Sequence, residues 1–238
     1  MSNRPLFLLP ERLSLCAAYV RKGARLIDVG TDHAYLPIWL AKSGKISHAV
    51  ACDLREGPLA HASENVRKYR VEKWVETRLS DGLLKILPDE ADDIVIAGLG
   101  GEVIAEIIER AEWLRNPQKR LILQAMTSAE DLRRYLNRRR FAVLEEKAVE
   151  SDGRVYSVML VHYSGKPQEM RSWFPYIGRL DKDKSAQSGE YIRREMRHLE
   201  NRKLGFAKTG RLREARDMEQ TLLLLQALLD SREGEEET

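Results

Sequence analysis

Residues 26–37, with the sequence LIDVGTDHAYLP, decide the fold class of this chain. They start as an apolar run typical of a buried strand, pass into a polar turn at Gly30, and continue into a helical pattern. In open α/β sheets, ligands bind at this edge, where the parallel strands end. The turn lacks the glycines of a G-x-G-x-x-G loop, and its acidic side chains would repel a pyrophosphate. The stretch therefore argues against a dinucleotide and favours a positively charged ligand.

Strand-like and helical segments alternate outward from this stretch up to about residue 163. Apolar patterning predicts strands at 25–29, 49–53, 75–79, 93–97, 120–124, 141–149 and 154–163. Segments 36–43, 57–69, 102–113 and 129–139 have helical spacing and can serve as crossovers, whereas the third strand reaches the fourth through the shorter connection 82–92. The last two strands are joined by residues 151–153, which leaves no space for a helix and predicts a β-hairpin. The predicted fold class is α/β, a Rossmann-like seven-stranded class I methyltransferase domain, because a terminal antiparallel hairpin favours that fold over an NAD-binding domain.

Composition places the chain among folded proteins. Of its 238 residues, 43% are hydrophobic and 32% are charged, and there is no long Pro/Gly/Ser tract. No run approaches the ~20 apolar residues of a membrane span, and the N-terminus lacks the pattern of a secretory signal, so we expect a cytoplasmic protein. Cys16 and Cys52 have no spacing suited to a metal or to a disulfide framework. We expect both to be buried thiols, and no metal site.

The character of the sequence changes after Pro167. From there onward it is charged and helix-forming, which predicts a methyltransferase domain at 1–165 and a helical, coiled-coil-like domain at 166–238. Segments 185–205 and 211–229 are expected to form an antiparallel hairpin. The expected apolar stripe on the second helix consists of Leu212, Ala215, Met218, Leu222, Leu225 and Leu229.

Basic residues gather in this helical part. Between residues 193 and 216 there are nine basic and three acidic residues, although the net charge of the whole chain is only +3. Such a local excess predicts a surface for a polyanion. The expected phosphate contacts come from Arg193, Arg194, Arg197, Arg202, Lys203, Lys208 and Arg211. The basic segment 133–140 is a second candidate surface of this kind.

Three acidic residues stand at the ends of the first three predicted strands. Asp28 is placed to attract the amino group of an amino-acid cofactor, Asp53 to bind ribose hydroxyls, and Asp81 to accept from an adenine amino group. Gly30 lets a cofactor approach the backbone closely. This set predicts S-adenosylmethionine, which carries a sulfonium and an ammonium group, although each turn alone also suits an ordinary strand-to-helix connection. The remaining expected cofactor contacts are Leu54, Gly82, Ala97 and Gly98.

Residues 28–37, DVGTDHAYLP, and 97–101, AGLGG, resemble the signatures of bacterial tRNA (adenine-22-N1)-methyltransferases, the TrmK family. The resemblance covers nearly the whole chain, including the helical C-terminal part, and Ala125 departs from it where proline is expected. It implies that the protein transfers a methyl group from S-adenosylmethionine to N1 of an adenine in the D-arm region of tRNA. It also favours a monomer, with no obligate protein partner evident.

Residues just past the first turn are the candidates for the reaction itself. N1 of adenine offers a lone pair at neutral pH, so positioning and charge stabilisation matter more than a strong base. Asp32 is expected to stabilise charge or to accept from the exocyclic amine. Tyr35 is expected to stack on or hydrogen-bond to the extruded adenine, although core packing explains this lone aromatic equally well. His33 and Asn65 are further candidates for contacts with the base, although turn capping and solvent exposure explain these two equally well.

Other classes of function stay open at this point. Many amino-methylating enzymes have an Asn/Asp-Pro-Pro-aromatic motif after strand four, which this chain lacks. The chain could instead methylate a small molecule or a protein, with the helical tail serving dimerisation. It could also be a non-catalytic RNA-binding module that holds S-adenosylmethionine. A nicotinamide-dependent oxidoreductase is the remotest alternative, since the glycine pattern and the terminal hairpin both oppose it.

Overall fold

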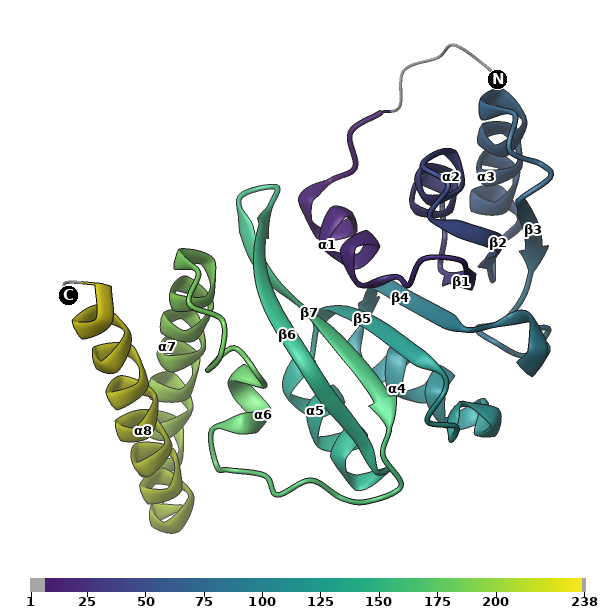
Figure 1. The fold of residues 1–238 in the computed structure, drawn as a ribbon. Coiled ribbons are helices and arrows are strands. Elements are labelled where there is room, and N and C mark those ends of the chain that lie inside the picture. The colour runs from purple at the N-terminus through teal and green to yellow at the C-terminus, as the bar shows by residue number, and fades with distance from the viewer. Residues whose placement is uncertain (1–6, 237–238) are drawn as a thin grey trace.

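The computed structural model describes residues 7–236, which form one seven-stranded sheet with helices on both faces and a helical pair at the C-terminal end (Figure 1). The strands are β1 (Ala24–Val29), β2 (Ile46–Asp53), β3 (Val75–Leu79), β4 (Asp93–Gly100), β5 (Arg120–Thr127), β6 (Phe141–Ser151) and β7 (Arg154–Tyr163). The helices are α1 (Glu11–Tyr19), α2 (Tyr35–Lys42), α3 (Glu56–Tyr69), α4 (Gly101–Arg110), α5 (Ala129–Arg138), α6 (Phe174–Ile177), α7 (Ala186–Lys208) and α8 (Leu212–Glu236).

The sheet has the strand order β3-β2-β1-β4-β5-β7-β6. Strands β1 to β5 are parallel, and β7 pairs antiparallel with both β5 and β6. This arrangement confirms the Rossmann-like fold class and the terminal hairpin. The connection from β3 to β4 contains only a short 3-10 turn, Pro88–Glu90, as its length predicted. The order reverses beside β1, and such a switch point is where open α/β sheets bind ligands.

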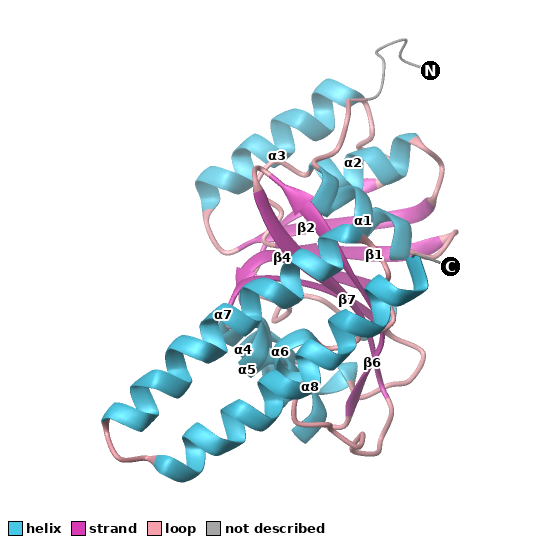
Figure 2. Ribbon diagram, turned by 90° about the vertical axis from the view of Figure 1, so that its left-hand side faces the viewer, coloured by secondary structure: helices cyan, strands magenta, loops and turns pink. Residues whose placement is uncertain are grey.

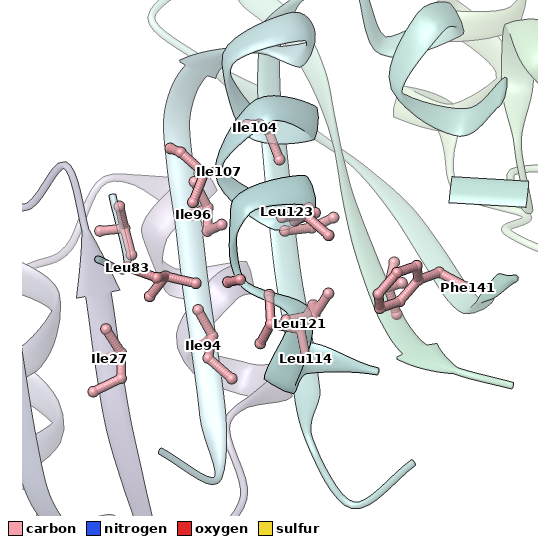
Figure 3. Packing of buried hydrophobic residues seen from close by; sticks show 14 of the residues in the cluster. Ile27, Leu83, Ile94, Ile96, Ile104, Ile107, Leu114, Leu121, Leu123 and Phe141 are labelled. Atoms are coloured by element: carbon pink, nitrogen blue, oxygen red, sulfur yellow. The ribbon is translucent and has the colours of Figure 1, made fainter. Parts of the chain in front are cut away.

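Side chains that alternate along the strands fill two separate hydrophobic layers. In β1, Ile27 belongs to the layer under α4 and α5, where it joins Ile104 (Figure 3). Its neighbour Leu26 belongs to the opposite layer, where Leu36 of α2 and Ala62 of α3 pack together with α1. Both faces of β1, β2, β4 and β5 are therefore largely buried, which explains their long apolar runs, whereas the edge strand β3 (VETRL) is buried only at Val75.

Element boundaries differ from the predictions mainly where glycine and aromatic residues interrupt a pattern. Strands β4 and β5 run three residues further than predicted, to Gly100 and Thr127, because the two continue to pair past a register shift at Leu99. Helix α4 ends at Arg110, and residues 112–114 form a separate 3-10 turn instead of its last turn. Helices α1 and α6 were not predicted as separate elements. Cys16 and Cys52 are both buried and unpaired, as expected.

Helices α7 and α8 lie side by side as a hairpin (Figure 2), which confirms the predicted C-terminal helices. Together with Trp173 and α6 they form a third hydrophobic cluster, and Val155 of β7 belongs to it. The stripe of α8 is confirmed at Leu222, Leu225 and Leu229 but is wrong at Leu212, which is 58% exposed. Leu212 is the first residue of α8, directly after the turn that joins the two helices. Coiled-coil packing and the division of the chain at residue 165 stay predictions.

Arg133 is buried in the structure, although it belongs to a basic segment of the sequence. Its side chain is fully buried, and Nη2 lies 2.6 Å from Glu146 Oε1, also buried. The same guanidinium donates to the carbonyl oxygens of Pro175 and Tyr176, at 2.9 and 2.8 Å, and to the hydroxyl of Tyr191 at 3.1 Å. The prediction that residues 133–140 form one phosphate-binding surface is therefore wrong for Arg133. Sequence patterning cannot separate a buried arginine from its exposed neighbours when its partners lie on other elements.

Within residues 7–236, no helix is both long enough and apolar enough to cross a membrane.

Candidate active site

The ends of β1, β2 and β3 are held next to one another by backbone hydrogen bonds. The amides of Gly30 and Thr31 both donate to the carbonyl oxygen of Cys52, at 2.9 and 3.1 Å. The amide of Ser80 donates to the carbonyl oxygen of Asp53 at 2.9 Å. Gly30 has a φ of +74°, so the chain can turn away from the sheet there without a side chain in the way. These bonds bring the three acidic strand ends to one edge.

An open pocket of about 380 Å³ lies at this edge. Five of the predicted cofactor residues line it: Gly30, Asp53, Leu54, Asp81 and Gly82. Three of the predicted set, Asp28, Ala97 and Gly98, do not line it. The pocket also has an apolar wall that sequence reasoning missed, built from Leu99, Val103 and Ile107. Val103 is 48% exposed at the start of α4, and an exposed apolar residue after a glycine-rich turn is the signal that could have revealed this wall.

Asp28 lies beneath this edge and is 7% exposed. The hydroxyl of Thr31 donates to its Oδ2 at 2.5 Å. Burial raises the pKa of Asp28 to about 6, and the nearby negative charge of Asp53 adds to the rise, whereas the Thr31 hydroxyl and the Arg12 guanidinium oppose it. The carboxylate is thus mostly ionised at neutral pH, although its ionisation lowers the stability of the folded protein. A buried negative charge of this kind suits the binding of a cation.

The other two acidic strand ends differ in their surroundings. Asp53 is buried at the end of β2, and its Oδ1 accepts from the Arg55 amide at 2.9 Å. Asp81 is more exposed, and its Oδ2 lies 2.7 Å from Arg110 Nη2 of α4. Asp53 therefore has one oxygen that the backbone orients, and Asp81 has one oxygen free of the ion pair. Arg110 was not among the predicted site residues.

The end of β4 is fixed by Gln124, a fully buried residue of β5 that sequence reasoning also missed. Its Oε1 accepts from the Gly98 amide at 3.1 Å, and its Nε2 donates to the carbonyl oxygen of Ala125 at 3.0 Å. Gly98 has a φ of +81°, and a Cβ there would lie 3.6 Å from Arg12 Nη1. Arg12 of α1 therefore brings a positive charge close to Gly98, and its guanidinium also acts on Asp28, so the end of β4 suits an anionic group.

The four candidates for the reaction lie together past the β1 turn, outside the pocket. Asp32 Oδ2 is 3.6 Å from His33 Nε2, and the His33 ring stacks on the Tyr35 ring with centroids 5.2 Å apart. Tyr35 is 38% exposed. Asn65 comes from α3, and its Nδ2 donates to the carbonyl oxygen of His33 at 3.0 Å. In this structure Asn65 thus holds the turn that presents Asp32, while its oxygen stays available.

Gly101 begins α4 at a point where the backbone of the next crossover passes very close. A Cβ at Gly101 would lie 2.3 Å from the carbonyl oxygen of Ser128. We expect Gly101→Ala to lower the free energy of unfolding by about 1–3 kcal/mol, the usual cost of overpacking, as measured by urea denaturation. Gly57→Ala in α3 is the matched control, because a Cβ there meets nothing within 4 Å. Equal stability of the two variants would contradict this account of the turn.

Known proteins with this architecture support the class of protein that the site suggests. A family model described as a methyltransferase domain matches residues 9–159. The tRNA (adenine(22)-N(1))-methyltransferase of Bacillus subtilis is 38% identical over 152 residues, which cover 64% of this chain and 64% of that enzyme. The alignment thus spans somewhat less than two thirds of the curated relative.

Solved structures extend the similarity to the C-terminal helices. The crystal structure of the Bacillus subtilis m1A22 tRNA methyltransferase TrmK has a TM-score of 0.82 and 30% identity, over 94% of this chain and all of that one. A Streptococcus pneumoniae protein crystallised in complex with S-adenosyl-L-methionine has a TM-score of 0.77 and 32% identity, over 92% and 98%. The fold and the acidic strand ends define a methyltransferase. Within that class, the chain belongs to the TrmK family.

Proposed function

We propose that this protein methylates N1 of adenine 22 in the D-arm region of tRNA, with S-adenosylmethionine as the methyl donor. The observation that carries the proposal is the pocket at the ends of β1 to β3, where acidic side chains converge in a chain of the TrmK family. The Bacillus subtilis relative is named for this reaction, and the Streptococcus pneumoniae relative was crystallised with this cofactor.

The residues of the pocket suit the separate parts of S-adenosylmethionine. Asp53 is placed to accept from the ribose hydroxyls, and the free oxygen of Asp81 to accept from the adenine amino group. The apolar wall that includes Leu99 and Ile107 suits the adenine ring. Asp28 and Arg12, with opposite charges, lie near the end of β4 and suit the ammonium and carboxylate groups of the methionine part.

Chemistry at N1 asks little of the protein beyond alignment. When bound, S-adenosylmethionine supplies an activated methyl group, and N1 supplies the lone pair that attacks it. The positive charge moves from sulfur to the base, so a carboxylate near the base lowers the barrier. Asp32 is the candidate for this task, and Tyr35 for stacking on the flipped adenine. Asn65 acts on both, because it fixes the backbone of the turn between them.

A groove of about 710 Å³ runs between the start of α5, the β6–β7 turn and α7, and we assign it to the tRNA backbone. Several of the predicted phosphate contacts already pair with acids: Arg194 with Glu195, Arg202 with Glu130, Lys203 with Glu200 and Arg211 with Glu214. In the described part of the chain, Arg197 and Lys208 make no ion pair. Arg197 also lines the groove, whose other basic and carboxylate side chains are Arg154, Arg194, His198, Glu130, Asp131, Glu190 and Glu195. Arg197 is thus the best placed of the predicted contacts.

Arg197→Ala is expected to weaken tRNA binding and to reduce the slope of log affinity against log salt concentration by about 1, the effect of losing one phosphate contact. Arg213→Ala is the matched control, because Arg213 is also exposed and basic but lies on α8 and does not line the groove. Fluorescence anisotropy with labelled tRNA over a salt series measures both quantities. If the two variants have the same slope, the groove is not the tRNA site.

The direct test incubates the purified protein with S-adenosylmethionine and unmodified bacterial tRNA transcripts, followed by digestion and mass spectrometry of the fragments. We expect 1-methyladenosine at position 22 and nowhere else, and no product from a transcript that has guanine at that position. Cofactor binding without methylation of any tRNA would reject the proposal. It would leave a methyltransferase for a protein or small molecule, or an RNA-binding module, as the alternatives.

A further inference from the structure

Two histidines and an aspartate meet at the mouth of the candidate active site. Asp32, His33 and His61 each offer one ligand atom, and these atoms lie within 4.8 Å of one another. Asp32 and His33 belong to the turn after β1, whereas His61 belongs to the neighbouring helix α3. The candidate chemistry at N1 uses Asp32 but gives no role to His61. Sequence spacing could not reveal the cluster, because the two histidines lie on different elements.

The cluster is partly ordered by its surroundings. The His33 ring stacks on Tyr35 and also on His61, with centroids 5.4 Å apart and planes 15° apart in the second pair. Asn65 donates to the carbonyl oxygen of His33 and so fixes its backbone. Asp32 and Ala34 have φ values of +47° and +54°, a tight turn that directs the Asp32 carboxylate toward the ring. The turn and Asn65 thus hold Asp32 and His33 in place, which reduces the conformational freedom that a ligand would otherwise have to remove. The His61 ring must turn out of the stack to bind the same ion, because nearly parallel rings do not direct their in-plane lone pairs at one point.

The donor set has the chemistry of a borderline divalent metal. Two imidazole nitrogens and one carboxylate oxygen suit zinc, cobalt or nickel, whereas magnesium and calcium prefer oxygen alone. Ligands of a tetrahedral zinc ion lie about 3.4 Å apart, given bond lengths near 2.1 Å. Asp32 and His33, 3.6 Å apart, are already close to this spacing. The widest pair must approach by at most about 1.4 Å, which rotation of the exposed Asp32 and His61 side chains can supply. The exposed side would leave the ion open to water.

We propose that Asp32, His33 and His61 form a binding site for a zinc-like divalent transition-metal ion, and that an ion bound there blocks the candidate active site. The ion takes the carboxylate of Asp32 as a ligand and so removes it from the approaching base. It also places positive charge where positive charge develops on the adenine during transfer. The binding part is independent of the proposed function, whereas the inhibitory part rests on it.

Cobalt binding to the full chain tests the site directly. The protein is stripped with a chelator, freed of any purification tag, and titrated with CoCl₂ while visible absorbance is recorded. We expect one ion per chain, with the intense bands of a low-coordinate nitrogen and oxygen site. His61→Ala and Asp32→Asn should each weaken binding by at least about tenfold, since loss even of an outer-shell partner costs that much. His48→Ala on β2 removes a histidine elsewhere and should change nothing. Equal cobalt affinity in His61→Ala and the native chain would overturn the site.

Methylation assays with ZnCl₂ test the inhibitory part. Zinc should inhibit the native protein and the His48→Ala variant, and chelator should restore activity. His61→Ala should keep the metal-free activity and lose sensitivity to zinc. If zinc binds without inhibiting a protein that methylates tRNA, the inhibitory part is rejected. If the metal-free protein methylates no tRNA, the proposed function fails, and the cobalt titration decides the site by itself.

Discussion

Asp28→Asn is expected to lower kcat/KM for S-adenosylmethionine by about a hundredfold to a thousandfold, which corresponds to roughly 3–4 kcal/mol, within the range for removing one partner of a buried charge pair. The substitution keeps the shape of the side chain and an oxygen that can accept from the Thr31 hydroxyl. It removes only the negative charge that we assign to the ammonium group of the cofactor. Isothermal titration with S-adenosylmethionine and steady-state kinetics measure the loss.

Although Asp28→Asn should weaken cofactor binding, it should raise the stability of the cofactor-free protein. The pKa of Asp28 is about 6 in the folded state, against 3.8 ordinarily, so the folded state holds this proton more tightly. The stability gained from this is complete below pH 3.8 and is lost as the pH rises through 6. The difference corresponds to about 3 kcal/mol, so Asp28→Asn should melt several degrees higher than the native protein at pH 8.

A pH series separates this account from a general structural role. For the native protein, affinity for S-adenosylmethionine should fall as the pH drops below about 6, because the carboxylate then becomes protonated. For Asp28→Asn this dependence should vanish. If Asp28→Asn both loses cofactor binding and melts at a lower temperature than the native protein at pH 8, Asp28 stabilises the fold and is not a preformed charge for the ammonium group of the cofactor.

Arg133→Met is expected to lower the free energy of unfolding by about 3–5 kcal/mol, because it leaves Glu146 as a buried, uncompensated charge. It also removes the donor for two backbone carbonyls of the α6 segment. Chemical denaturation of the full chain measures the effect. A double variant, Arg133→Met with Glu146→Leu, should recover part of the loss, since no charge then stays buried.

Arg138→Met is the matched control for this prediction. Arg138 lies on the same helix α5 but is exposed, and surface substitutions of this kind change stability by no more than about 0.5 kcal/mol. A similar, small effect of the two substitutions would contradict the role given to the buried pair. A double variant less stable than Arg133→Met would also contradict it.

The sequence predicted the strands of the sheet better than the helices that pack on the sheet. All seven strands were predicted within a few residues. The strands β1, β2, β4 and β5 show as short apolar runs because both their faces are largely buried, and β6 and β7 are marked by the short turn that joins them. Helix α1 was not placed, since its role comes from packing across β5, β6 and β7, which local periodicity does not contain. The C-terminal helices were placed, yet Arg133 of α5, which pairs with Glu146 of β6 and donates to α6 and to Tyr191 of α7, was taken for part of a basic surface.

Site prediction succeeded where chemistry follows from position at a strand end. Gly30, Asp53 and Asp81 line one pocket because parallel strands end at one edge. Residues that act through another element were missed. Gln124 fixes Gly98 from β5, and Arg12 approaches the same glycine from α1. Such contacts depend on tertiary geometry and leave no periodic signal in the sequence.

The buried pair of Arg133 and Glu146 also affects how the protein unfolds. The connection between β7 and α6 is largely exposed, as expected for a hinge between independent modules. Yet Val155 of the sheet belongs to the cluster of the C-terminal helices, and the Arg133 guanidinium finds its carbonyl acceptors only in the α6 segment. Departure of the helical part would thus strip donors and acceptors from the sheet. The change in composition after Pro167 marks a boundary in topology, and we expect the two sides of it to unfold in a single cooperative transition.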